Sequence, residues 1–398
     1  MRTGTSSIVV AAFVGPGTVL TCASAGVDFG YALGWVLVFA TVAAFVLQSY
    51  TAGTGILARR GLGEAIRAEL SAPRVRRAAT GLVVLGLWIG CAAFELGNLI
   101  GAASGVTAFL DVSFDQRWLV ALLAGCAAGI LLLDLRALIH VFTALVVGMS
   151  GLFLVGLASA PVDWGAALTG LTMPQVPEGG VVRVLALVGT TVVTYNLFLH
   201  PSAAKQYWAD TDDRAAAWRG ELRGMAFFLP VGGLVSFSIL AAGATLSGTT
   251  SGLEDVGAFA TLLEPVAGSF ARLCFGLGLF AAGLTSSLTA PLAAAAGTCE
   301  VLGWDSEPTS LPYRAVWGSV LAAGLGVGLV GWDPLPAIVA AQAANGLLLP
   351  IIAGFVMYLT LRQQVVSLPV WYHVLGGGVV LLCGGLGLRT LWWVAQQI

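Results

Sequence analysis

Polar side chains stand in pairs inside two apolar stretches, at spacings that place each pair on one face of a helix. Glu95 and Asn98 are three residues apart, and Asn196 and His200 are four apart. An acid or histidine within a membrane segment is costly to bury, and it usually serves the passage of protons or ions. We therefore assign Glu95, Asn98 and His200 to proton coupling, with Glu95 and His200 as a relay. The alternative is a protonated Glu95 that only hydrogen-bonds a neighbouring helix.

An uncharged apolar run near the N-terminus contains a helix breaker, Gly15-Pro16-Gly17. Pro16 removes one backbone donor, and the glycines relax the chain on either side. Inside a bilayer, the carbonyls left free near Val14 and the amides left free near Thr18 need partners. Secondary transporters hold their substrates at such broken helices. The alternative is a proline-kinked helix buried in a bundle.

A second interruption follows halfway along the chain, where six hydrogen-bonding side chains share one apolar segment: Thr190, Thr191, Thr194, Tyr195, Asn196 and His200. Threonine hydroxyls often bond carbonyls of their own helix. Two broken helices at corresponding positions of two halves nevertheless indicate an inverted repeat with a substrate site near the membrane midplane. The predicted substrate-binding residues surround both breaks, with one more on a later span: Gly15, Gly17, Thr18, Thr190, Thr194, Tyr195, Asn196 and Gln342.

The composition indicates that the two broken helices lie among many other membrane-embedded helices. The chain of 398 residues is 58% hydrophobic and 10% charged, with a mean hydropathy of +0.92. These values predict a polytopic all-α membrane protein. Eleven apolar runs are long enough to span a bilayer, at 8–25, 31–56, 81–109, 117–133, 137–159, 184–208, 225–246, 267–297, 316–331, 334–360 and 368–394.

The basic residues orient these spans. Fourteen of the eighteen Lys and Arg residues fall on one side if the N-terminus is cytoplasmic, which predicts a multi-pass protein of the inner (plasma) membrane with its C-terminus outside. We expect one transporter domain, 1–398, with inverted repeats at about 8–159 and 184–361, an extra helix at 368–394 and an external loop at 160–183. The arginines at 74–77 are expected to meet anionic membrane lipids rather than a protein partner.

Four segments carry a resemblance to one family. Gly15-Pro16-Gly17-Thr18 is similar to the Asp-Pro-Gly-Asn break in the first helix of NRAMP (natural resistance-associated macrophage protein) transporters. The stretch 193–200, Val-Thr-Tyr-Asn-Leu-Phe-Leu-His, resembles their Met-Pro-His-Asn-Leu-Tyr-Leu-His in helix six. The stretches 281–292 and 342–350 resemble their eighth and tenth helices. The resemblance covers nearly the whole chain and implies a LeuT-type fold, with eleven helices and a site between broken helices 1 and 6.

The departures from the family pattern fall at that site. The family ligates a divalent metal with the Asp and Asn of helix 1 and the Met of helix 6, where this chain has Gly15, Thr18 and Val193. Of the two acids that the family uses for proton transfer, Glu95 is similar to the first, and Asn98 stands in place of the second.

Without an acid or thioether, we predict no metal ligands and no tight binding of manganese or iron. Half-helix N-termini attract anionic groups, so the site suits a small polar organic solute. We predict transport, together with protons, of a carboxylate or an amino-acid derivative such as 5-oxoproline. The alternatives are a proton-coupled importer of manganese, iron or magnesium with a carbonyl-rich site, and a non-transporting sensor or scaffold. We expect no enzymatic activity, cofactor or nucleic-acid partner; the oligomeric state stays open.

Overall fold

A computed structural model describes residues 4–110, 115–248, 264–330, 334–363 and 368–395, and these residues form helices without strands. The helices are α1 (Ser6–Phe13), α2 (Pro16–Phe29), α3 (Gly34–Ile56), α4 (Leu62–Glu69), α5 (Pro73–Leu110), α6 (Gln116–Leu131), α7 (Leu135–Ser159), α8 (Trp164–Thr172), α9 (Val181–Thr191), α10 (Asn196–Tyr207), α11 (Arg214–Ala244), α13 (Glu264–Leu302), α14 (Leu311–Val330), α15 (Pro334–Gln363) and α16 (Val370–Ala395).

Seven of the described helices are long and apolar enough to cross a membrane, and the bent pair α1 and α2 adds an eighth. Three shorter apolar segments, Gln116–Leu131, Leu349–Arg362 and Val370–Gly385, coincide with further predicted spans. The predicted all-α polytopic architecture is therefore confirmed, whereas the number of eleven spans stays a prediction.

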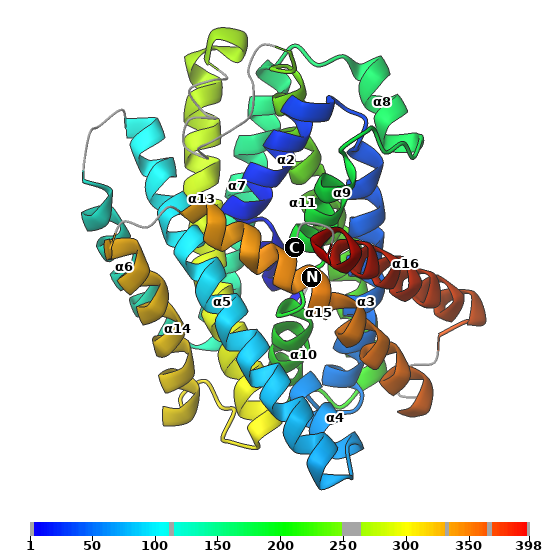
Figure 1. Ribbon diagram of the computed structural model, residues 1–398. Coiled ribbons are helices and arrows are strands. Elements are labelled where there is room, and N and C mark those ends of the chain that lie inside the picture. The colour runs from blue at the N-terminus through cyan, green and yellow to red at the C-terminus, as the bar shows by residue number, and fades with distance from the viewer. Residues whose placement is uncertain (1–3, 111–114, 249–263, 331–333, 364–367, 396–398) are drawn as a thin grey trace.

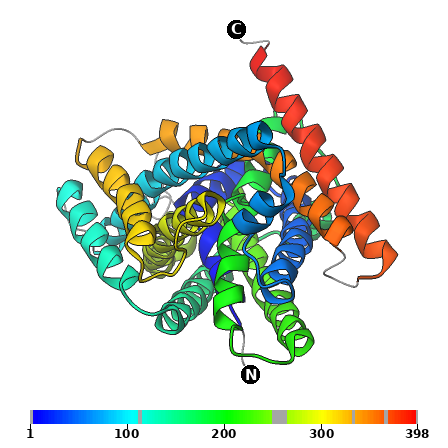
Figure 2. The ribbon, with the colours of Figure 1, turned by 90° about the horizontal axis from the view of Figure 1, so that it is seen from below.

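The broken N-terminal pair runs through the middle of the bundle. Figure 2 shows α1 and α2 in dark blue, enclosed by the other helices, while α16 lies along the outside. Helix α1 contacts α7, α10, α11 and α13, and α2 contacts α5, α9, α11 and α13. The long α5 crosses the front of the molecule obliquely (Figure 1). Every side chain of α1 is buried, which explains why this segment has no charged face.

Glycines let the helices approach the break closely. A Cβ atom on Gly101 of α5 would overlap the Pro16 ring. A Cβ atom on Gly26 of α2 would overlap the Leu240 carbonyl oxygen of α11. Small residues at membrane-helix contacts allow this backbone proximity, and here they hold α2 against two neighbouring helices.

Two features differ from the sequence-based expectation. The predicted loop 160–183 contains a short helix, α8, whose N-cap Asp163 accepts hydrogen bonds from the amides of Gly165 and Ala166. Helix α5 begins at Pro73 instead of residue 81, so Arg74 and Arg77 lie on its first turns. Proline is favourable at the first position of a helix because its missing N–H has no helical partner there, which explains the earlier start.

Candidate functional site

The first break bends the chain by 58° between α1 and α2. Gly15 is extended, with φ −116° and ψ 178°, and Pro16 starts α2. The Gly15 amide donates to the Phe13 carbonyl at 3.1 Å, and the Thr18 hydroxyl donates to the same oxygen. Thr18 thus bridges the two half-helices from the α2 side, as a capping side chain does in an ordinary helix end.

Side chains from other parts of the bundle satisfy further carbonyls at the end of α1. The Tyr195 hydroxyl donates to the Ala12 carbonyl at 2.9 Å. The Ser286 hydroxyl of α13 donates to the Ala11 carbonyl at 3.3 Å. A backbone acceptor buried away from water costs free energy if it is unpaired. The carbonyls at the break therefore already accept hydrogen bonds from this chain's own hydroxyls, and a substrate would compete with these hydroxyls for them.

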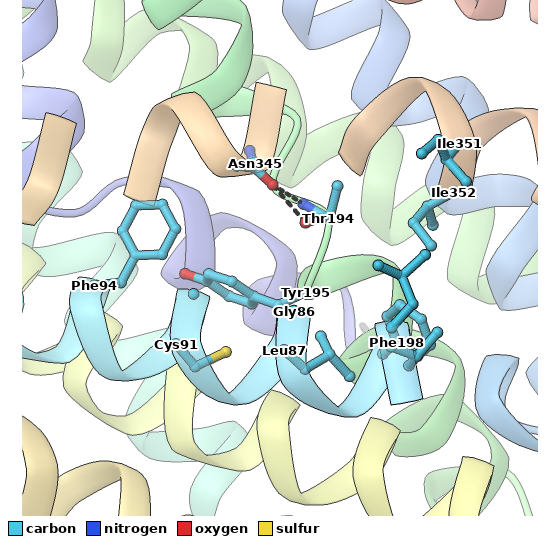
Figure 3. A pocket seen from close by; sticks show the side chains of 13 residues that line it. Gly86, Leu87, Cys91, Phe94, Thr194, Tyr195, Phe198, Asn345, Ile351 and Ile352 are labelled. Atoms are coloured by element: carbon cyan, nitrogen blue, oxygen red, sulfur yellow. Dashed lines mark hydrogen bonds between the residues drawn. The ribbon is translucent and has the colours of Figure 1, made fainter. Parts of the chain in front are cut away.

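The second break, between α9 and α10, is held by Asn345 of α15. The Asn345 amide nitrogen donates to the Gly189 carbonyl at 2.6 Å and to the Val192 carbonyl at 3.3 Å. Its oxygen accepts from the Thr194 amide at 2.8 Å and from the Thr194 hydroxyl at 2.5 Å (Figure 3). One buried side chain therefore pairs four polar groups at the interruption and stabilises it.

A cavity of about 20 Å³ lies between the two breaks. It is lined by Ala12, Phe13, Gly15, Gly17, Thr18, Phe94, Asn98, Thr190, Val193, Tyr195 and Ser286. A water molecule needs at least about 10–15 Å³ measured in this way. In this conformation the cavity therefore accommodates one water-sized group, and its polar lining consists of hydroxyl, amide and backbone groups.

The structure brings several of the predicted site residues to this cavity but separates others from it. Asn98, expected to couple protons, lies on the wall instead, within 3.6 Å of the position that a Cβ on Gly15 would occupy. Thr194 turns toward Asn345. The Asn196 amide donates to the Val9 carbonyl at 3.1 Å, while its buried side-chain oxygen has no hydrogen-bond partner. Gln342 lies outside the residues whose side chains are described.

Glu95 and His200, the expected relay, make no hydrogen bond to each other. Glu95 is completely buried, and among the described residues neither carboxyl oxygen has a hydrogen-bond partner of standard geometry, although the Asn98 and Ser287 side chains lie nearby. His200 instead contacts Gln48 at 2.9 Å and Glu221 at 3.1 Å. The acid and the histidine thus belong to two different buried clusters.

A second, apolar cavity of about 40 Å³ lies between α5 and α15 (Figure 3). Tyr195 and Phe94 are common to both cavities, and their rings meet edge to face at 5.7 Å between centroids. Apart from Thr194, Tyr195, Asn345 and Cys91, its lining consists of apolar residues and glycines. This pair of rings therefore lies between the two cavities.

No carboxylate is among the described residues that line the break cavity. Within the described part of the chain, no group of three His, Cys, Asp or Glu side chains is arranged to hold a metal ion. An ion in this cavity would therefore be coordinated by neutral oxygens alone.

Residues 6–393 match the sequence profile of a family described as natural resistance-associated macrophage protein-like. The chain belongs to the Nramp family. Members of this family are transporters and not enzymes, and the present chain is a multi-pass membrane transporter.

Individual relatives agree with this assignment. A divalent metal cation transporter MntH of Burkholderia ambifaria is 27% identical over 98% of this chain and 88% of its own length. The crystal structure of an Eremococcus coleocola manganese transporter superposes with a TM-score of 0.78, at 19% identity, over 98% of this chain and 85% of that one. The structure of MhsT in complex with L-phenylalanine superposes at 0.59, with 14% identity and 98% coverage of both chains. These superpositions confirm the LeuT-type fold.

Three residues that organise the two breaks and the helices around them were not predicted as site residues: Ser286, Asn345 and Glu221. The stretches 281–292 and 342–350, which contain the first two, were recognised only for their resemblance to family helices. Asn345 lies in an apolar helix. Its position could have indicated a structural role, because a buried amide needs hydrogen-bond partners. Ser286 lies in a run of small polar residues, Thr-Ser-Ser, which does not distinguish it from its neighbours. Glu221 lies between Arg219 and Arg223, a pattern typical of an exposed helix end.

Proposed function

We propose that this chain is a secondary active transporter that carries a divalent metal ion through the cavity between its two broken helices. The supporting observation is the size and chemistry of that cavity, which has about 20 Å³ and a wall with five hydroxyl or amide side chains among apolar residues. Binding pockets for organic molecules usually enclose about 300–1,000 Å³. The names of the sequence relatives also favour a metal ion over the organic solute that the sequence alone suggested.

The proposed ligands are neutral oxygens at the break. Asn98 and Thr18 supply side-chain oxygens, and the α1 end supplies the Ala12 and Phe13 carbonyls. Hydroxyls of Tyr195 and Thr18 now occupy those two carbonyls, so the ion would exchange with them. Hard cations such as magnesium accept such ligands, whereas softer metals gain most from sulfur or imidazole.

The same donor set lowers the expected affinity. No formal counter-charge offsets the cost of removing water from the ion, because Gly15, Thr18 and Val193 carry neither acid nor thioether. We therefore propose weak binding with little preference for manganese over magnesium. A transporter with such weak binding would carry the ion when its concentration is high.

A small carboxylate or amino-acid derivative, such as 5-oxoproline, is the second candidate. The specific observation in its favour is the absence of any carboxylate from the cavity lining at the positive end of the α2 helix dipole. This candidate requires the cavity to enlarge several-fold in another conformation, because about 20 Å³ does not hold a ring.

Several finer features belong to the same proposal. The substrate moves with protons, and Glu95 carries the proton. The two inverted repeats span about 8–159 and 184–361, with the extra helix at 368–394. The N-terminus faces the cytoplasm, and the C-terminus faces outward. The broken helices in both halves and the distribution of basic residues support this arrangement.

Uptake into proteoliposomes tests the two substrates directly. We expect magnesium and manganese to enter with similar low affinity, and radiolabelled 5-oxoproline to stay outside. Asn98→Ala should reduce metal uptake, because it removes one wall oxygen. Gln175→Ala is the control, because it removes an exposed amide side chain that does not line the cavity, and it should leave uptake unchanged. Uptake of the carboxylate without uptake of metal would reverse the assignment.

A further inference from the structure

A large basic cavity lies at the end of the molecule that the distribution of basic residues assigns to the cytoplasm. It has about 1,000 Å³ and lies where α4, the first turns of α5 and the end of α13 meet. Figure 1 shows α4 beside the start of α5, at the bottom of the view. Four arginines line it, Arg60, Arg67, Arg76 and Arg77, and we call it the arginine pocket.

The positive charge of this pocket is not neutralised by the protein. Glu64 is the one acid among the described residues that line it. The Glu64 carboxylate already binds the Lys205 ammonium, at 2.8 and 3.0 Å, and accepts from the Gly61 amide at 3.1 Å. Among the described residues, none of the four arginines forms an ion pair. Four guanidinium groups in one concave site favour an anion with several oxygens, because guanidinium matches phosphate geometry.

The pocket opens onto an apolar helix face. Gly81 lines the pocket, and a Cβ atom placed on it meets no atom within 4 Å. Residues four apart share a helix face, so Leu85 and Ile89 continue the line that starts at Arg77 and Gly81. Leu85 is 61% exposed and Ile89 is 58% exposed, as expected for side chains that face lipid. A ligand with a phosphate head and apolar chains fits both parts.

We propose that the arginine pocket binds the phosphate headgroup of an anionic phospholipid, whose acyl chains lie along the Leu85 and Ile89 face of α5. Basic pockets at the cytoplasmic ends of membrane helices bind such headgroups. The apolar continuation favours a lipid over a free phosphate ion, which would use the arginines alone. Contact with lipid at 74–77 was expected from the sequence, but the pocket includes Arg60 and Arg67, which lie before and on α4, and its lining leaves out Arg74.

Arg67 also fixes one wall of the pocket. Its guanidinium lies so close to Gly303 that a Cβ atom there would overlap Nη1. Gly303 follows the end of α13, where the helix dipole attracts a cation. A bound headgroup would therefore connect α4, α5 and the end of α13 through one set of charges.

Thermal unfolding of the detergent-solubilised protein tests this site. The probes are dioleoylphosphatidylglycerol, dioleoylphosphatidylcholine and inorganic phosphate. We expect phosphatidylglycerol to raise the melting temperature by about 3–5 °C near saturation, and the other two to leave it unchanged. R76Q/R77Q should lose most of that shift. Gly81→Glu, which places a carboxylate in the open space on the pocket wall and offsets one arginine charge, should lose most of it as well.

Arg74→Gln is the matched control, because it removes a neighbouring arginine outside the pocket lining and should retain the full shift. Each variant is compared with its own melting temperature without lipid, and Gly81→Glu covers the case in which R76Q/R77Q fails to fold. The proposal would be wrong if phosphatidylcholine gave an equal shift, or if Arg74→Gln lost as much of the shift as R76Q/R77Q. Either result would mean that lipids contact the protein surface without using this pocket. An equal shift with inorganic phosphate would show that the pocket binds a phosphate ion and does not need a lipid.

Discussion

His200 of α10 and Glu221 of α11 meet at 3.1 Å with both side chains completely buried. The Glu221 carboxylate also accepts from the Thr5 amide at 3.0 and 3.1 Å and from the Ser6 hydroxyl at 2.8 Å. It therefore lies at the positive end of α1, where a carboxylate is stabilised. This one acid connects the first half-helix to the helices that follow the second break.

Replacing Glu221 with glutamine should destabilise the protein by about 2–3 kcal/mol. The amide would present a donor to groups that are themselves donors, among them Trp208, whose ring N–H donates at 2.8 Å. The free energy of unfolding can be measured by titration with SDS in mixed micelles. Glu307→Gln, at an exposed acid, serves as the control and should change stability by less than about 0.5 kcal/mol. Equal stability of both variants would show that the cluster contributes nothing.

The sequence predicts much of this architecture because the relevant signals are local. Gly15-Pro16-Gly17 breaks a helix wherever it stands, and apolar runs of membrane length predict spans without tertiary information. The contact between His200 and Glu221 is different, because it depends on the packing of α10 and α11 around α1. The arginines on either side of Glu221 give no indication that this turn of α11 buries its acid.

The sequence placed residues of both breaks close together, but it did not predict how they hydrogen-bond. The family motifs led to Thr18 and Tyr195, and both line the cavity. Sequence reasoning treated Tyr195 as a substrate ligand, whereas its hydroxyl donates to the Ala12 carbonyl. Small differences in distance and direction decide whether a side chain hydrogen-bonds the substrate or a backbone group of the protein. The spacing of residues in the sequence does not determine these differences.

Asn345→Ala should disturb the second break. The substitution leaves the Gly189 and Val192 carbonyls and the Thr194 amide without their present partner. We expect a loss of about 1–3 kcal/mol in stability, together with loss of uptake. Thr360→Ala on the same helix removes one hydrogen bond within α15 and should cost less than about 1 kcal/mol. Normal uptake by Asn345→Ala would mean that the break does not need this clamp.

Glu95→Gln should leave folding intact and remove the pH dependence of uptake. The carboxyl oxygens make no hydrogen bond of standard geometry, so the amide loses none, and the new side chain cannot release a proton. Uptake into proteoliposomes with an imposed pH gradient, read against the wild type and after a check of the melting temperature, measures the effect. Unchanged gradient-driven uptake would assign Glu95 a structural role only.

Restoring the family's acid at the first break should create a stronger divalent-cation site. A Cβ atom at Gly15 would lie 2.6 Å from the Ser286 hydroxyl oxygen, so Gly15→Asp alone forces Ser286 to move. The double variant G15D/S286G provides the space and places a carboxylate beside Asn98 and Thr18. One counter-charge at a dehydrated ion should tighten manganese binding at least tenfold, or by about 1.4 kcal/mol.

The matched control for that design is G15N/S286G, which has the same shape without the charge. Isothermal titration with manganese should show tighter binding to the aspartate variant and no gain for the asparagine variant. A carboxylate at this position should also repel an anionic solute, so the aspartate variant separates the two proposed substrates. Equal manganese affinity in both variants would mean that the ion does not bind between α1 and α2. The broken helix would then have only a structural role.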